Sequence, residues 1–277
     1  MPAVPAPPTP WSLLRVLVTG AAGSVGGAVR AGLAGRYAEL RLLDREPLLP
    51  TSPGETVVRC DISDRDAVRD AARGVDCIVH LAGVPTEASW EALLPANVIG
   101  TCNVFDAAVD CGVRRVVLAS SNHVVGFARA QSEIGVLDPM RPDSRYAVTK
   151  VFAEALGRLH ADKHGIAVVC LRIGSFRPAP QSRRQLATWI GPRDMTALVR
   201  CAIEAPGVEF AVVYGVSNNR GNRWRNPQAA VIGFTAAQSA DDYTGQVPDD
   251  PPDAGIHFHG GRFCAIELTR DPATIGR

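Results

Sequence analysis

The sequence predicts an α/β fold in which a doubly wound parallel sheet carries helices on both faces and a small C-terminal lobe. Two features of the sequence favour this fold. Short apolar or β-branched runs alternate with stretches of helical periodicity along most of the chain, which is typical of βαβ units. The first of these runs leads directly into a glycine-rich turn and then into a helical pattern, as in sheets that bind ligands at their strand ends.

Each strand and helix is predicted from its own run of residues. The strands are predicted at residues 15–19, 39–43, 56–60, 77–80, 115–120, 167–172 and 209–214, where short runs are rich in β-branched or apolar side chains. The helices are predicted at residues 24–34, 64–72, 91–109 and 144–164, where apolar side chains recur at helical spacing. Because strand and helix alternate, the strands are expected to be parallel.

Composition sets the domain boundaries. Residues 1–13 are rich in proline and lack apolar periodicity, so they are predicted to form an unstructured tail. Residues 14–277 are predicted to form one domain, whose core covers about 14–175 together with the strand near 209–214. Prolines, glycines and asparagines interrupt residues 176–208 and 215–277, which predicts a small lobe on the sheet that contacts the substrate.

Composition also argues against several classes of protein. A net charge of +1, with 46% hydrophobic and 21% charged residues, is ordinary for a globular domain and provides no field that attracts nucleic acid. No uninterrupted apolar stretch reaches the length of a bilayer span, and the N-terminus lacks the pattern of a signal peptide. We therefore expect a cytoplasmic protein that binds neither membranes nor nucleic acid.

Neither the cysteines nor the histidines predict a metal site. The seven cysteines are scattered without a Cys-x-x-Cys pair, which indicates neither a disulfide framework nor a zinc site. We expect them to be small buried apolar side chains. His160 and His164 lie one helical turn apart but lack the glutamate of a zinc protease motif. We expect that turn to be solvated and to hold no metal.

The glycine-rich turn predicts a Rossmann-type dinucleotide site. It comprises Gly20, Gly23, Ser24, Val25 and Gly26, directly after the first predicted strand. Glycines allow a tight turn and let the backbone approach a pyrophosphate. The amides at the start of the following helix then stabilise the negative charge.

Acidic and apolar residues at the ends of the next strands extend this site. Asp44 ends the second predicted strand, where a carboxylate bonds the ribose hydroxyls and repels a 2′-phosphate. This favours NAD, although the adjacent Arg45 keeps NADP open as an alternative. Asp61 and Ile62, and then Leu81, Ala82 and Gly83, follow the third and fourth strands and are predicted to line the cofactor site. For Asp61, a helix N-cap is the alternative.

Three residues are predicted to carry the chemistry. Tyr146 and Lys150 lie four positions apart and therefore on one face of a helix. A nearby ammonium lowers the pKa of a phenol, which makes tyrosine usable as a base. Ser121 follows the fifth predicted strand, where its hydroxyl can bond the substrate oxygen while Tyr146 takes the proton. The sequence thus predicts an oxidoreductase site built on a dinucleotide.

These motifs resemble those of the extended-type short-chain dehydrogenases, and among them the uronate dehydrogenases. The resemblance covers nearly the whole chain apart from the proline-rich tail. It is carried by Ala-Ser-Ser-Asn-His at 119–123, Arg-Pro-Asp-Ser-Arg-Tyr at 141–146, Arg-Ile-Gly-Ser at 172–175, Arg184, Thr-Trp at 188–189 and His-Gly-Gly-Arg-Phe at 259–263.

The resemblance implies an activity and a role for each site residue. It implies NAD-dependent oxidation of the C1 hydroxyl of a hexuronic acid, such as glucuronate or galacturonate, to an aldarolactone. Tyr146 would be the base and Lys150 its modulator. Ser121, Asn122, His123 and Ser175 would contact the sugar, and Arg184 would hold its carboxylate, as a planar guanidinium can. Homo-oligomers are common in this superfamily, and the helices at 91–109 and 144–164 are the expected contact.

Several alternatives stay open at this point. Pro85 stands where the family pattern places a serine, and proline offers neither a hydroxyl nor an amide hydrogen. A dehydrogenase of another monosaccharide is therefore one alternative. A sugar-nucleotide epimerase or dehydratase is another, although few residues follow Ser175 to grip a nucleotide. A non-catalytic dinucleotide sensor is disfavoured because Tyr146 and Lys150 are both present. From the residues alone, Arg184 reads as a solvated charge and His123 as a structural hydrogen-bonder.

Overall fold

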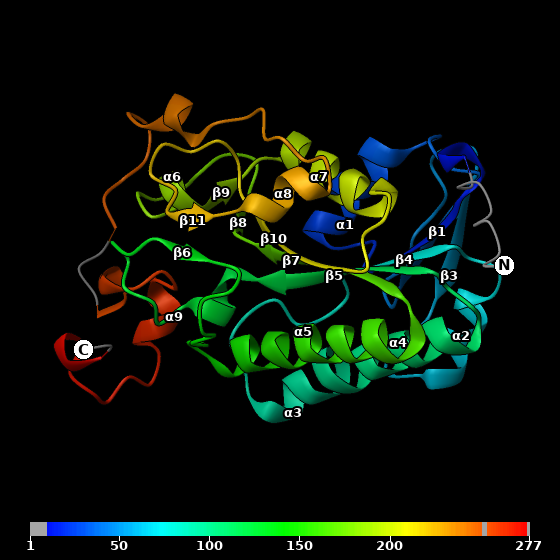
Figure 1. The fold of residues 1–277 in the computed structure, drawn as a ribbon, viewed down its shortest axis with the longest axis horizontal. Helices are drawn as coiled ribbons and strands as arrows, with labels where there is room; N and C mark the ends of the chain where they lie inside the picture. The colour runs from blue at the N-terminus through cyan, green and yellow to red at the C-terminus, as the bar shows by residue number, and fades with distance from the viewer. Residues whose placement is uncertain (1–9, 251–253, 276–277) are drawn as a thin grey trace, which may run out of the picture.

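The computed structural model describes residues 10–250 and 254–275. It is a three-layer α/β arrangement in which one central sheet lies between two layers of helices (Figure 1). The smaller elements of the C-terminal part gather at the end of the sheet away from the N-terminus. The predicted fold class is therefore confirmed.

The central sheet contains seven parallel strands in the order β10-β7-β5-β4-β1-β2-β3. Their bounds are β1 (Arg15–Thr19), β2 (Glu39–Asp44), β3 (Glu55–Arg59), β4 (Cys77–His80), β5 (Arg115–Ser121), β7 (Ala167–Ile173) and β10 (Phe210–Gly215). Every predicted strand is confirmed, with ends that shift by at most one residue. The order reverses between β1 and β4, and ligands bind open α/β sheets at such a switch point.

Helices cover both faces of the sheet because successive strand residues point to opposite sides. Val16 and Val18 of β1 belong to one apolar core, together with α1 (Ser24–Leu33) and α7 (Pro192–Glu204). Leu17 belongs to the other core, together with α2 (Arg65–Ala72), α4 (Thr101–Asp110) and α5 (Arg145–His164). The four predicted helices are confirmed in position.

Helix α7 corrects the predicted extent of the C-terminal lobe. Residues 176–208 were assigned to that lobe, but Leu198, Val199 and Ala202 of α7 are fully buried in the same apolar core as β1. The helix also packs beside α1. The prolines around this segment predicted loops. Pro192, however, stands at the first position of α7, where proline is tolerated, and the helix that follows it packs on the sheet.

The helix predicted at 91–109 contains a wider turn. It runs through α3 (Trp90–Leu93), the π-helical η2 (Leu94–Gly100) and α4. Taken together, Trp90–Asp110 is long and apolar enough to cross a membrane by length and composition, although polar residues interrupt its apolar runs. Half of it is buried inside the protein, against α2 and α5. This packing accounts for its apolar character.

Short elements complete the structure. They are η1 (Trp11–Leu13), η3 (Asn122–Val125), β6 (Ile134–Gly135), β8 (Ser175–Phe176), α6 (Gln185–Thr188), β9 (Trp189–Ile190), β11 (Trp224–Arg225), α8 (Pro227–Val231), η4 (Ala240–Tyr243), η5 (Ala254–His257), α9 (Arg262–Ala265) and η6 (Pro272–Thr274). Strand β6 pairs with β11, and β8 pairs with β9. The predicted tail covers residues 1–13; residues 1–9 lie outside the described residues, and Trp11–Leu13 form a single 3-10 turn.

Two expectations about single side chains need correction. All seven cysteines are free, but Cys60, Cys102, Cys111 and Cys201 are only half-buried. His160 is buried rather than solvated, because it stacks on Phe105 with ring centroids 4.7 Å apart. Across residues 10–250 and 254–275 there is no cluster of three or more His, Cys, Asp or Glu side chains that could hold a metal.

Candidate active site

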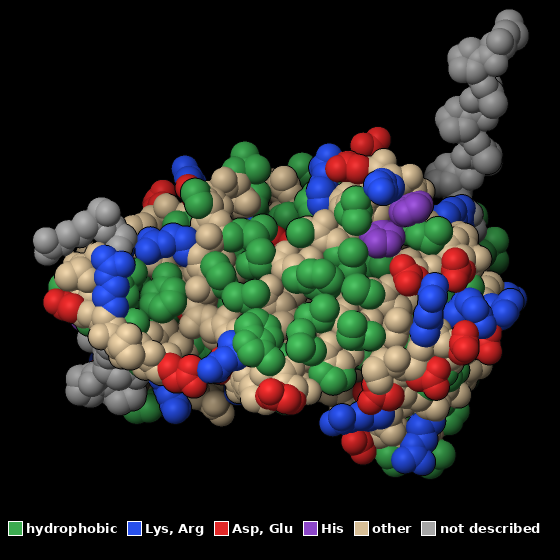
Figure 2. All heavy atoms as spheres, turned by 90° about the horizontal axis from the view of Figure 1, so that it is seen from below, with side chains coloured by type: hydrophobic (Ala, Val, Ile, Leu, Met, Phe, Trp, Pro, Cys, Tyr) green, Lys and Arg blue, Asp and Glu red, His purple; other side chains and the backbone are tan. Residues whose placement is uncertain are grey.

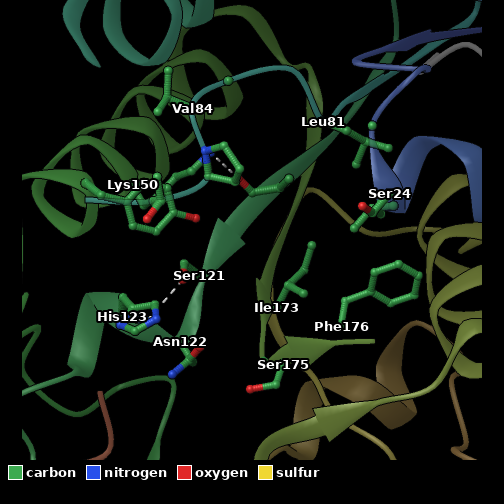
Figure 3. A pocket seen from close by; sticks show the side chains of 18 of the residues that line it. Ser24, Leu81, Val84, Ser121, Asn122, His123, Lys150, Ile173, Ser175 and Phe176 are labelled. Carbon is green, nitrogen blue, oxygen red and sulfur yellow. Dashed lines mark hydrogen bonds between the residues drawn. The ribbon is translucent and has the colours of Figure 1, made fainter. Parts of the chain in front are cut away.

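One cavity of about 1350 Å³ lies over the carboxyl ends of the central strands. Figure 3 shows side chains entering it from several elements: Ser24 from α1, Lys150 from α5, and Ser121 to His123 from the end of β5. The predicted site residues that line it are Gly20, Gly23, Ser24, Val25, Gly26, Asp44, Asp61, Ile62, Leu81, Ala82, Gly83, Ser121, Asn122, His123, Tyr146, Lys150, Ser175 and Arg184. The structure thus brings all of them together, from Gly20 to Arg184.

The turn between β1 and α1 has the shape that a dinucleotide needs. Gly20 has φ +72°, which side chains rarely adopt, and a β-carbon there would lie 2.6 Å from the amide nitrogen of Ala82. A β-carbon on Gly26 would lie 2.2 Å from the carbonyl oxygen of Gly20. Gly23 caps α1 without any side-chain hydrogen bond. The first amides of α1 therefore remain available to an anion.

Asp44 lies at the end of β2, at the edge of this turn. Its carboxylate accepts hydrogen bonds from the amides of Ala22 (2.9 Å) and Glu46 (3.0 Å). The side chain of Arg45 is 74% exposed and lies 3.6 Å from the carboxylate of Glu46. Asp44 is thus fixed in place, whereas Arg45 is held only by a surface ion pair, which contributes little.

The N-cap alternative for Asp61 is wrong. Helix α2 is capped by Asp64, whose side chain accepts a hydrogen bond from the amide of Ala67. Asp61 instead accepts hydrogen bonds from the amide and the hydroxyl of Ser63, both at 2.8 Å, and these lower its pKa. Its side chain remains part of the cavity wall.

Tyr146 and Lys150 enter the cavity from the first turns of α5. The side chain of Ser144 caps this helix by accepting a hydrogen bond from the amide of Ala147 (3.1 Å). The Lys150 Nζ donates to the carbonyl oxygen of Ala119 at 3.0 Å and lies 5.8 Å from the centre of the Tyr146 ring. Both side chains are buried. The structure thus brings the two side chains together, and the role of the lysine stays a prediction.

Burial dominates the titration of this pair. It raises the pKa of Tyr146 to about 12, although a hydrogen bond with Ser121 acts in the opposite direction. Burial also lowers the pKa of Lys150 to about 8. The predicted lowering of the tyrosine pKa by Lys150 is therefore not seen in the protein by itself, because both groups lose their contact with water.

Asn122 and Ser175 lie at the far end of the cavity from the glycine turn (Figure 3). Orienting the Asn122 amide by its neighbours makes its nitrogen donate to the carbonyl oxygen of Ile173 (3.1 Å) and its oxygen accept from Arg184 Nη2 (3.0 Å). The Ser175 hydroxyl is hydrogen-bonded to the Thr188 hydroxyl at 2.9 Å. Pro85, which replaces the expected serine, also lines the cavity.

Arg184 is not the solvated charge that its sequence context alone suggests. Its Nε and Nη2 donate to the carbonyl oxygen of His259 at 2.9 and 2.6 Å, and its amide donates to Asp250 at 2.7 Å. Burial lowers the pKa of its guanidinium. A β-carbon on Gly261 would lie 2.6 Å from its Cδ, so the C-terminal segment packs tightly against it.

Sequence reasoning missed two residues that shape this end of the cavity. The Nδ1 of His123 lies 2.7 Å from a carboxylate oxygen of Asp143, and the ring of Phe263 stacks on His123 with centroids 4.0 Å apart. Both missed residues lie in segments that carry the family resemblance, at 141–146 and 259–263. Their position in these segments was the available signal, but it did not indicate that both residues contact His123.

The sequence profile of the NAD dependent epimerase/dehydratase family matches residues 16–192, more than half of the 277-residue chain. The chain belongs to this family. Within the family, the uronate dehydrogenase of Pseudomonas putida is 39% identical over 261 residues, which cover 92% of this chain and 97% of that enzyme. The NAD-dependent glucose-6-phosphate dehydrogenase of Haloferax volcanii is 39% identical over 251 residues, covering 83% and 95%.

A solved structure of the same family agrees. A mutant of uronate dehydrogenase from Agrobacterium tumefaciens, complexed with NAD, superimposes with a TM-score of 0.86 and 38% identity, and the match covers 91% of this chain and 97% of that one. These similarities confirm the fold and the resemblance to uronate dehydrogenases. The roles of the individual site residues stay predictions.

Proposed function

We propose that this chain is an NAD-dependent uronate dehydrogenase, which oxidises the C1 hydroxyl of a hexuronic acid such as glucuronate or galacturonate to an aldarolactone. The observation that carries the proposal is that one cavity contains the dinucleotide turn, the Tyr146 and Lys150 pair, and the guanidinium of Arg184. The 39% identity to the uronate dehydrogenase of Pseudomonas putida supports it. A nucleotide sensor would not need the arginine at the far end.

The residues present fit NAD. A β-carbon at Gly20 or Gly26 would fill the turn where a pyrophosphate needs close backbone approach. The start of α1 would hold the pyrophosphate, and Asp44 would bond the adenosine ribose. Asp61, Ile62 and the segment from Leu81 to Gly83 would line the rest of the site. When bound, NAD supplies the acceptor for the hydride from C1.

Tyr146 is the proposed base. It takes the proton of the C1 hydroxyl while Ser121 donates a hydrogen bond to the same oxygen. The ammonium of Lys150 would favour the phenolate and would hold the nicotinamide ribose. A cofactor and a sugar that fill the cavity displace water from it, which strengthens these electrostatic effects.

Arg184 is the proposed carboxylate-binding residue. Its two bonds to the carbonyl oxygen of His259 use Nε and Nη2, which leaves Nη1 on the planar guanidinium for the substrate. Asn122, His123 and Ser175 would bond the sugar hydroxyls beside it. Substituting Arg184→Lys should raise KM for a uronate by roughly tenfold or more, because an ammonium cannot bond the His259 carbonyl and the substrate carboxylate with the geometry of a planar guanidinium. An unchanged KM would contradict this role.

The first experiment measures NAD or NADP reduction by absorbance with glucuronate, galacturonate, glucose, galactose and UDP-glucose. Reduction of NAD with the two uronates alone supports the proposal. Reduction with neutral sugars instead keeps the dehydrogenase chemistry but contradicts the uronate assignment. No reduction with any sugar contradicts both and favours an epimerase or a sensor.

A tyrosine variant tests the base. Tyr146→Phe should lower turnover by roughly 100- to 10,000-fold while NAD still binds, because the phenyl ring keeps the packing and removes the proton acceptor. The matched control is Tyr37→Phe, which removes a buried hydroxyl outside the cavity and should leave turnover within about twofold. Retained turnover in the first variant would contradict the assignment.

A second candidate is oxidation of another monosaccharide at C1. Two observations favour it: Pro85 removes a hydroxyl donor from the cavity wall, and the Haloferax volcanii relative is a glucose-6-phosphate dehydrogenase. A lost hydrogen bond changes selectivity among sugars without changing the reaction. Adding glucose 6-phosphate and arabinose to the sugar panel distinguishes the two candidates.

We also propose that the enzyme is a cytoplasmic homo-oligomer. The free state of all seven cysteines fits a reducing compartment. Exposed apolar side chains on the helices from Trp90 to Asp110 and on α5 supply a surface for a second copy of the chain.

A further inference from the structure

Asp143 is a buried carboxylate at the edge of the cavity, to which no role has been given above. Its side chain is fully buried, and its Oδ2 lies 2.7 Å from the Nδ1 of His123, whose side chain is 13% exposed. It stands just before α5, which carries Tyr146, and it contacts His123 of η3, the short helix that follows β5. Asp143 therefore links the two elements that supply the site.

The carboxylate of Asp143 is enclosed so that it cannot turn away from His123. A β-carbon on Gly126 would lie 1.8 Å from its Oδ2, and one on Gly260 would lie 1.9 Å from the same atom. Its Oδ1 accepts a hydrogen bond from the Ser144 hydroxyl at 2.8 Å. The Cys264 thiol donates weakly to Oδ2 at 3.8 Å. Backbone on two sides and donors on two others fix its position.

This enclosure selects one state of the His123 ring. A carboxylate is an acceptor, so the neutral imidazole places its hydrogen on Nδ1 and leaves a lone pair on Nε2. Among the described residues, no hydrogen bond occupies Nε2, and His123 lines the cavity. The stacked ring of Phe263 keeps the imidazole from rotating.

We propose that Asp143 is a positioning residue that holds His123 in the Nδ1–H form, so that Nε2 accepts a hydrogen bond from the sugar hydroxyl next to the reacting one. The centre of the His123 ring lies 6.1 Å from that of Tyr146, so one sugar ring could contact both side chains at neighbouring hydroxyls. The inference rests on the proposed sugar oxidation. It adds a requirement: the neighbouring hydroxyl must be present and must act as a donor.

Nitrogen-15 NMR of the histidine side chains tests the ring state directly, on the unaltered protein. His123 is assigned by comparison with a His123→Ala variant, among the six histidines of the chain. The neutral ring should carry its hydrogen on Nδ1 and none on Nε2. A hydrogen on Nε2 would overturn the proposal whatever the activity of the enzyme.

A substrate lacking the neighbouring hydroxyl tests the consequence. With the wild-type enzyme, 2-deoxyglucuronate should react with a kcat/KM roughly 10- to 100-fold below that of glucuronate, because the buried acceptor loses its donor. In Asp143→Ala, the kcat/KM for glucuronate should fall by a similar factor, and the deoxy sugar should then lose little more. In Asp143→Asn, much of the glucuronate activity should return, because the amide oxygen still accepts from Nδ1.

The control variant is Asp70→Asn, which removes a carboxylate on α2 that is 64% exposed and should change neither ratio. A deoxy penalty that stays full in Asp143→Ala would overturn the proposal, as would an Asp143→Asn variant no better than alanine. Should the wild-type enzyme oxidise no uronate, the proposed function fails, while the NMR result still decides the state of His123. If the Asp143→Ala variant does not fold, the NMR measurement on the unaltered protein still tests the proposal.

Discussion

At the residue scale, Asp44 is the group expected to choose the cofactor. Its carboxylate is held by two backbone amides, so in the proposed site it would face the ribose in a fixed position and repel a 2′-phosphate. Substituting Asp44→Ser should lower kcat/KM with NAD by roughly 10- to 100-fold, since a charge-assisted hydrogen bond is lost. It should raise the activity with NADP, because Arg45 stands beside it.

Steady-state rates with both cofactors at saturating uronate measure this change. The matched control is Glu46→Gln, which removes a neighbouring charge that is 64% exposed. An NAD to NADP preference that stays constant in Asp44→Ser, or that changes equally in the control, would show that Asp44 does not set the choice.

Lys150 is predicted to lower the free energy of unfolding because its ammonium is buried. Burial lowers its pKa from an ordinary value of 10.5 to about 8. Charging it in the folded protein therefore costs free energy, on the order of 3 kcal/mol, at every pH below that folded value. The cost disappears as pH rises toward the unfolded value. Lys150→Met should thus be more stable than the wild type near about pH 7, and this advantage should shrink near about pH 10.

Urea unfolding at the two pH values gives both free energies. The comparison variant Lys163→Met changes an exposed lysine near the end of the same helix and should show no such pH dependence. If the stability difference between Lys150→Met and wild type is the same at both pH values, the buried ammonium carries no cost and the interpretation is wrong.

Which side chains could be predicted from sequence depends on how local their partners are. The glycine turn, Tyr146 and Lys150 follow from spacing within one turn or one helix, and the structure brings them together. Asp143 and Phe263 were missed because their partner, His123, lies on a different element. The burial of Arg184 was missed for the same reason, since the carbonyl of His259 comes from a distant segment.

At the scale of elements, a buried ion pair connects α5, the helix that carries Tyr146 and Lys150, to the sheet. Glu154 of α5 accepts two hydrogen bonds from Arg172 of β7, both at 2.9 Å, and one from the Ser120 hydroxyl of β5 at 2.5 Å. Arg172 also donates to the Tyr214 hydroxyl of β10 at 3.3 Å. This network therefore joins α5 to three strands directly beneath the site.

Removing one member of this pair should destabilise the protein strongly. Glu154→Met leaves the Arg172 guanidinium buried without its counter-charge, which should lower the free energy of unfolding by about 3–5 kcal/mol. The double variant with Arg172→Met should lose less, because two apolar side chains of similar volume can pack there. Urea unfolding compares the variants. A single variant as stable as wild type, or a double variant less stable than the single, would contradict this account.

Elements were predictable where one periodicity covers the whole segment. Most of the strands carry apolar runs because both faces of a parallel sheet are buried, and each of the seven was found, including the partly exposed edge strand β3. No helix was predicted at α7, because the prolines around it predicted short elements of the C-terminal lobe, whereas the helix joins an apolar core of the sheet. The π turn from Leu94 to Gly100 has no sequence signature that separates it from α-helix.

At the scale of the whole molecule, one helical face is expected to associate with a second copy of the chain. Figure 2 shows hydrophobic side chains across the middle of the face formed by these helices, with charged side chains toward its edges. The large apolar residues exposed on these helices are Trp90, Leu94, Ile99, Val109, Val148 and Leu159. An apolar centre with a polar rim is the pattern of a protein interface.

Placing a charge on this face should separate the two copies. Val148 and Leu159 are 44% and 45% exposed on α5, and a symmetric dimer would bring each close to its own partner helix, so one substitution changes the interface twice. Val148→Glu and Leu159→Glu, made separately, should each convert a dimer into a monomer at micromolar concentration, as measured by light scattering after gel filtration. The control Val231→Glu lies on α8, where the valine is 64% exposed, and should leave the dimer intact. A monomeric wild type, or a control variant that dissociates as readily, would show that this face is not a dimer interface. The exposed apolar side chains would then need another partner.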